Sequence, residues 1–246
     1  MTSGKKAAIG GTCFFLVAIG VELIYLHHER NLPGKVPAKV DYGPTDPDDL
    51  VFLKKERPSS MADLKDLYGK TLWVSAGGQM EYYPASAHHA DYAQPAGTLL
   101  GAEPLVVKDA FEQVAPKDAT YRIPGGDRQV LLSFTMPNSK DPKKLYAVPV
   151  GYQDGKDYEF STDEIFFYDD PHQLYKWSPE IWQAIDSHQV ILGMNERQVQ
   201  LALGQVSKSV SSEYGNRLVV YANVGHPIAV TFVKNHVTAF RPDQGF

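Results

Sequence analysis

Cysteine is nearly absent from the 246 residues: the only one, Cys13, lies in an apolar segment near the N-terminus. A single cysteine excludes an intrachain disulfide and a metal site built from several thiolates. The folded part must therefore be stable through burial of side chains alone. That property suits a bacterial envelope protein better than a small secreted animal domain.

An excess of positive charge is also lacking. The chain has 24 Lys and Arg against 29 Asp and Glu, which gives a net charge of −5. The basic residues are scattered, with only short pairs such as Lys54-Lys55 and Lys143-Lys144. Because nucleic-acid binding needs a concentrated basic surface, the sequence predicts no nucleic-acid partner.

Local signatures of catalysis do not occur either. The motifs G-x-S-x-G and H-E-x-x-H are missing, and Gly77-Gly78 and Gly125-Gly126 are isolated doublets that predict turns. The adjacent pairs His27-His28 and His88-His89 are poor metal sites, because neighbouring residues on a strand point to opposite faces. We therefore predict no enzyme, no cofactor and no metal site, with an undetected hydrolase as the least favoured alternative.

An apolar run is present at residues 7–26, AAIGGTCFFLVAIGVELIYL. Its length matches a helix that crosses a bilayer, and the preceding Lys5 and Lys6 favour a cytoplasmic N-terminus. No clear cleavage site follows, so an uncleaved anchor is favoured over a signal peptide. The sequence predicts a single-pass membrane protein that contacts the lipid bilayer through residues 7–26, with residues 1–6 in the cytoplasm and the rest extracytoplasmic, in the periplasm.

The remaining chain divides into a spacer and two folded parts. Residues 27–58 are rich in proline and read as an extended spacer. Residues 59–160 contain short alternating runs such as TLWVS (71–75) and QVLLSFTM (129–136), which predict a small antiparallel, SH3-like β-barrel. The predicted fold class is α+β.

The last part, residues 161–246, mixes helix and strand signals. Asn195 and Gly204 bracket a predicted helix with the sequence ERQVQLAL as its N-terminal and C-terminal caps. Three strands follow, at residues 217–222, 227–233 and 236–240. We expect helices packed on a three-stranded antiparallel sheet, with Trp177 and Trp182 inside the core.

The pattern Gly193-Met194 followed by Gln198-Val199 and Leu203-Gly204, with Tyr221 and Val230-Thr231-Phe232 after it, resembles the BamE/SmpA/OmlA family. That family consists of small envelope lipoproteins with two helices on a three-stranded sheet, which support outer-membrane β-barrel assembly. The resemblance covers about a third of the chain. Gln205 stands where the family usually has proline, and a predicted transmembrane helix replaces the lipid-bearing cysteine.

The candidate binding residues are aromatic and polar side chains of the predicted barrel and of its long loop at residues 85–97. They are Trp73, Tyr82, Tyr83, His88, His89, Asp91 and Tyr92. We predict a non-catalytic protein that binds a protein partner in the cell envelope, or supports its assembly. The alternative is a sensor or binding module for a peptide, glycan or small ligand. The sequence does not predict an oligomeric state.

Overall fold

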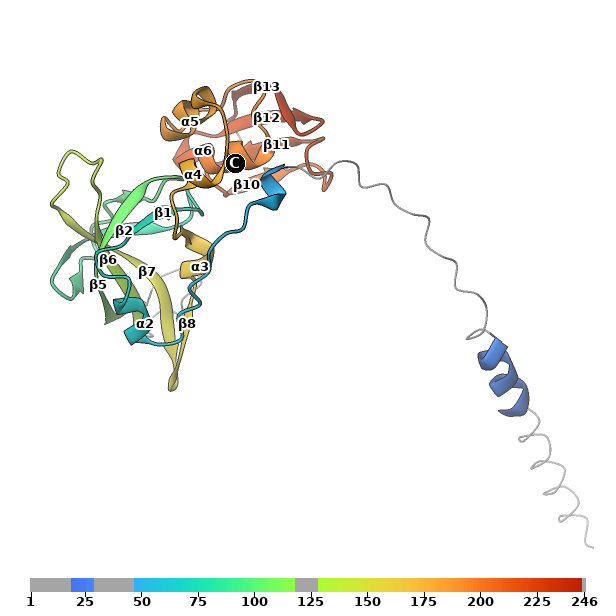
Figure 1. The fold of residues 1–246 in the computed structure, drawn as a ribbon, viewed down its shortest axis with the longest axis horizontal. Coiled ribbons are helices and arrows are strands. Elements are labelled where there is room, and N and C mark those ends of the chain that lie inside the picture. The colour runs from blue at the N-terminus through green and yellow to red at the C-terminus, as the bar shows by residue number, and fades with distance from the viewer. Residues whose placement is uncertain (1–18, 29–46, 118–127, 245–246) are drawn as a thin grey trace, which may run out of the picture. The chain divides into compact units, whose positions relative to one another are not determined.

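A computed structural model describes residues 19–28, 47–117 and 128–244 (Figure 1). The chain divides into two compact units, Met1–Asp49 and Leu50–Phe246. In the first unit, residues 19–28 form a helix. The 3-10 helix η1 (Pro47–Leu50) begins in the first unit and ends at the first residue of the second. Everything below concerns the second unit.

The predicted transmembrane anchor requires correction. Within the described ranges, no helix combines the length and the apolarity that crossing a bilayer demands. The described helix at residues 19–28 is about 15 Å long, roughly half of a hydrocarbon core. The rest of the predicted span, residues 7–18, lies outside the described residues. The same finding corrects the prediction of a single-pass membrane protein.

The larger sheet is antiparallel and has nine strands, in the order β3-β2-β7-β6-β5-β1-β9, with β4 beside β2 and β8 beside β7. Its strands are β1 (Thr71–Val74), β2 (Glu81–Ser86), β3 (His89–Ala90), β4 (Gly97–Thr98), β5 (Pro104–Val114), β6 (Arg128–Thr135), β7 (Leu145–Asp154), β8 (Asp157–Phe160) and β9 (Phe166–Phe167). This sheet replaces the small SH3-like barrel that we expected. The short strand β9 reaches it from beyond residue 160 and pairs with β1.

Strand alternation divides the side chains of this sheet between two clusters. Along β6, Val130, Leu132 and Phe134 enter the main core, whereas Leu131 points to the opposite face. Successive side chains of a strand point to opposite faces, so a nearly continuous apolar run is buried on both sides of the sheet. The run QVLLSFTM is therefore a central strand that is covered on both faces.

The smaller sheet has the strand order β10-β11-β12-β13. Its strands are β10 (Ser207–Ser209), β11 (Leu218–Tyr221), β12 (Ile228–Val233) and β13 (His236–Pro242). The three predicted C-terminal strands form, but β10 adds a fourth that we did not expect. Its sequence SKS lacks the apolar alternation that indicates a strand.

The helices are few and short. They are α2 (Met61–Lys65), α3 (Thr162–Ile165), α4 (Pro171–Leu174), α5 (Pro179–Asp186), α6 (Glu196–Leu203) and the 3-10 helix η2 (Asn223–Gly225). Helix α6 confirms its predicted bounds: Asn195 and Gln198 form a reciprocal capping box, and Gly204 is the C-cap. Most of the fold is antiparallel sheet, so the predicted α+β class was wrong.

Helices α5 and α6 cover one face of the smaller sheet (Figure 1). Val199 and Leu203 of α6 join Tyr221, Val230 and other strand residues in one hydrophobic cluster. Trp182, predicted to fill the core, is 8% exposed in the same cluster. It lies in a row of stacked rings that runs from His172 through Trp182 and Trp177 to Tyr175.

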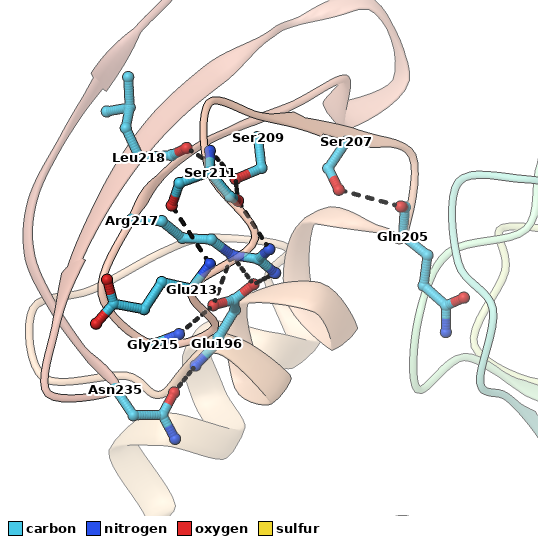
Figure 2. A network of polar contacts seen from close by, with 10 residues as sticks. All are labelled: Glu196, Gln205, Ser207, Ser209, Ser211, Glu213, Gly215, Arg217, Leu218 and Asn235. Carbon is cyan, nitrogen blue, oxygen red and sulfur yellow. Dashed lines mark hydrogen bonds and ion pairs between the residues drawn. The ribbon is translucent and has the colours of Figure 1, made fainter. Parts of the chain in front are cut away.

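A buried ion pair joins the start of α6 to the residue that precedes β11 of the smaller sheet (Figure 2). The Glu196 carboxylate is fully buried and accepts hydrogen bonds from the Arg217 guanidinium, with Nε at 3.0 Å from Oε1. The Gly215 amide also donates to Glu196, at 3.0 Å. In addition, the Glu196 amide donates to the Asn235 side chain at 3.2 Å. One helix start is thereby tied to two separate turns of the sheet.

Turns of the larger sheet meet helix α6 and its C-terminal end at closely spaced backbone atoms. We call this contact the glycine joint, and it consists of Gly77, Gly101, Leu201, Gly204 and Gln205. A Cβ on Gly101 would overlap the Leu201 carbonyl of α6, and one on Gly204 would lie 2.8 Å from the Gly77 carbonyl oxygen. The Gln205 amide donates to that same oxygen at 2.9 Å. Proline at position 205 would remove this donor.

Candidate functional site

The seven predicted binding residues do not converge on one site. Trp73 packs against the hydrophobic cluster under α5 and α6. Tyr82 belongs to the main core of the larger sheet, edge-on to Phe134 and Tyr146. Tyr83 follows Tyr82 on the same strand, so it points to the opposite face. A groove lined by all of these aromatic rings is therefore absent from the described residues.

Tyr83 and Tyr92 form a small cluster of their own on the second face of the larger sheet. Their rings meet edge-on with 5.0 Å between centroids, over Phe111 and Leu131. The Tyr92 hydroxyl donates to the Gln129 side chain at 2.8 Å, and burial raises the Tyr92 pKa. These two tyrosines pack internally, with their polar ends occupied.

The polar candidates lie on the hairpin above that cluster. The predicted long loop contains a tight hairpin, because Ser86 pairs with His89 and only two residues, Ala87 and His88, connect them. His88 Nε2 lies 2.7 Å from the Asp109 carboxylate, and His89 is exposed. The Asp91 carboxylate accepts a hydrogen bond from the Ala93 amide. Across the described ranges, no three His, Cys, Asp or Glu side chains gather as a metal-binding group.

The face of the smaller sheet that points away from α5 and α6 is a stronger candidate, and we call it the outer face. The registers of the four strands give its rows directly. One row runs Lys208, Val220, Ala229 and Arg241, and the next contains Leu218, Thr231 and Ala239. Val210 lies beside Leu218, to whose carbonyl its amide donates. The side chains in these rows alternate with Val219, Tyr221 and Val230, which face the helices.

The outer face is largely apolar, and its side chains differ widely in exposure. A sheet with one solvated face normally alternates apolar and polar residues, whereas β11 and β12 read LVVY and IAVTFV. Such continuous apolar strands are typical of a sheet that is covered on both sides. On this face Leu218 and Val220 are half-buried and Ala229 is 1% exposed, whereas Val206, Val210 and Val233 are 37%, 79% and 48% exposed. The continuous apolar runs of β11 and β12 are visible in the sequence, whereas the predicted binding site consisted of aromatic and polar side chains of the larger sheet.

One carboxyl group of the larger sheet has a strongly shifted pKa. Glu103, just before β5, is mostly buried, and burial raises the pKa of its carboxyl from 4.5 to about 7. Its charge also raises the pKa of the nearby Tyr82, behind the effect of burial. The folded protein binds a proton here more tightly than the unfolded chain does. Stability from this group is therefore present below pH 4.5 and is lost as the pH rises to 7.

We expect Glu103→Gln to raise the free energy of unfolding by about 2 kcal/mol at pH 8, because each pKa unit corresponds to about 1.4 kcal/mol and partial exposure reduces the full value. At pH 4 the variant and the wild type should unfold with nearly equal free energies. Urea denaturation between pH 4 and pH 8 measures the difference, with the exposed Glu213→Gln as the matched control. A difference that does not change with pH would contradict the assignment.

Comparisons with known proteins give no further information on the site: no family model, curated protein or solved structure matches this chain.

Proposed function

We propose that the protein is a non-catalytic binding protein that holds a protein partner on the outer face of its smaller sheet. The observation that carries the proposal is the apolar character of this face, on which Val206, Val210 and Val233 are exposed. Exposed apolar patches on soluble folds mark interaction surfaces, and each Val or Leu that a partner buries fully contributes about 1.5–3 kcal/mol. The resemblance of residues 193–204 to assembly lipoproteins agrees with a binding role.

The alternative, a small ligand or peptide at the 85–97 hairpin, has less support. Its aromatic members Tyr83 and Tyr92 pack against each other and against the sheet. A ligand would then meet mainly the polar side chains of His89 and Asp91. Such a surface offers little apolar area to a ligand.

The test replaces an exposed valine of the outer face. In capture experiments with the full chain and an extract of its source cells, we expect Val210→Asp to reduce the retained partner at least about tenfold. Val210 is 79% exposed, so its replacement should leave folding unchanged. The matched control is Val114→Asp, at a valine of the larger sheet that is 59% exposed.

The comparison of the two variants decides the proposal. Partner retention that falls with Val210→Asp and persists with Val114→Asp supports it, provided that thermal unfolding of both variants matches the wild type. Equal retention by both variants, or no retained protein at all, would contradict it. Val220→Asp, at the centre of the face, serves as a second replacement that should give the same result.

A further inference from the structure

We infer that the partner binds as an extended strand that adds to β10, the exposed edge of the smaller sheet, and places apolar side chains against Val206 and Val210. This inference rests on the proposed function, because both valines belong to the outer face. It names the part of the sheet that the partner contacts and the conformation in which the partner binds.

The backbone groups of β10 that face β11 belong to every second residue. The Val210 amide donates to the Leu218 carbonyl of β11, and the Val206 carbonyl accepts a hydrogen bond at 2.8 Å from the amide that follows β11. Along a strand, residues whose N–H and C=O groups point to one neighbour alternate with residues whose groups point away from it. The N–H and C=O groups of Ser207 and Ser209 therefore point to the side of β10 that is opposite to β11.

On that side, the structure gives these four groups no hydrogen-bond partner among the residues that it describes. All residues from 206 to 210 are exposed. The hydroxyls of Ser207 and Ser209 donate to the carbonyls of Gln205 and Ser211, so they leave the two outward amides open (Figure 2). Donors and acceptors that alternate at strand spacing are the pattern that another extended backbone matches.

The opposite edge of the sheet, β13, has features that prevent strand addition. Pro242 lacks an N–H group, and the register with β12 skips Thr238, as in a β-bulge. The Val237 amide and carbonyl are bonded to the Met194 carbonyl and the Gly193 amide of the loop before α6. Prolines, bulges and covering loops protect sheet edges from further pairing. Strand β10 contains no proline and pairs with β11 in a continuous register, so it is the open edge.

The side chains of β10 define what the added strand must carry. In a strand beside β10, every second side chain joins the outer face, where Val206 is 37% and Val210 is 79% exposed. Lys208 lies between the two valines and already interacts within the chain, so the inference makes no use of its charge. Backbone hydrogen bonds alone contribute little, because the free groups bond to water. The partner strand therefore needs apolar residues four positions apart, opposite the two valines.

The test exposes the purified full chain to a displayed library of random peptides, and we expect the enriched peptides to share two apolar residues four positions apart. Ser207→Pro and Ser209→Pro should each weaken binding of these peptides at least about tenfold. Proline removes an outward N–H and places its ring at the edge, while the bonds to β11 remain. Ser207→Ala and Ser209→Ala lose only the hydroxyl, and as matched controls they should bind like the wild type.

Methylation of the peptide backbone gives a readout that is specific to strand pairing. A methyl group on an N–H that points to β10 removes a hydrogen bond, whereas a methyl group on the next N–H points away. Binding should therefore fall for methylation at every second residue and persist at the residues between. The wild-type chain is used here, so this pattern decides the inference even if a proline variant unfolds. Losses without this alternation would overturn it.

The outcomes separate this inference from the proposed function. If Val210→Asp lowers partner capture from the source-cell extract but Ser209→Pro does not, the function stands and strand addition is wrong. If neither variant changes capture, the function fails as well. A library that yields no binding peptide, or self-association of the purified chain that Ser209→Pro abolishes, would also overturn the inference.

Discussion

Replacing Gly101 by alanine is expected to destabilise the protein by at least about 3 kcal/mol. The added methyl group would overlap the Leu201 carbonyl of α6, a backbone atom held by its own helix. A flexible side chain could rotate away, but here one of the two sheets must shift. Overpacking of this kind usually costs about 1–3 kcal/mol when side chains can adjust, and more when only backbone is available.

Urea denaturation of the full chain measures this loss, and Gly155→Ala is the matched control. Gly155 lies in the turn between β7 and β8 with φ of +61° and nothing within 4 Å of an added Cβ. Its replacement should cost only the strain of a left-handed backbone, about 1–2 kcal/mol. Equal losses for the two variants would show that the glycine joint is less tight than described.

The second large effect is expected for Arg217→Met, which should lower the free energy of unfolding by about 3–5 kcal/mol. The change keeps an apolar stem of similar length but leaves the fully buried Glu196 carboxylate without its guanidinium partner. The Gly215 amide remains as a donor, and one neutral hydrogen bond does not compensate a buried charge.

A double-mutant cycle separates the pair from its surroundings. Adding Glu196→Gln to Arg217→Met removes the buried charge, so the double variant should be more stable than Arg217→Met alone. Free energies of unfolding from urea denaturation of all four proteins give the coupling. A double variant whose loss equals the sum of the two single losses would mean that the two side chains do not interact.

Local sequence signals predicted the C-terminal elements well. Helix α6 begins and ends as expected because Asn195 and Gly204 act through their immediate neighbours. In contrast, β9 has only two residues and exists because β1 offers it a partner far away in sequence. Strand β10 is likewise defined by its pairing with β11 and not by its composition. Contacts of this kind leave no local pattern, so the sheet sizes and the fold class were missed.

The same alternation that identified the strands argued against the predicted aromatic site. Tyr82 and Tyr83 are adjacent on β2, so they could not both line one groove. The unbroken apolar strands of the smaller sheet predict that both of its faces are apolar. Which residues form the outer face can be predicted only when the face that packs against the helices is known. The row from Lys208 to Arg241 needed the strand registers, which the sequence alone does not provide.

The glycine joint also determines how the folded unit opens. Its contacts run from carbonyl and amide groups of one sheet to those of α6, and the Gln205 side chain adds a bond to the Ser75 carbonyl. Most of these contacts join backbone atoms, so we expect loosening of α6 to expose the turns of the larger sheet at the same moment. The two sheets therefore behave as a single cooperative folding unit, and their amide protons should become accessible to solvent in the same rare event.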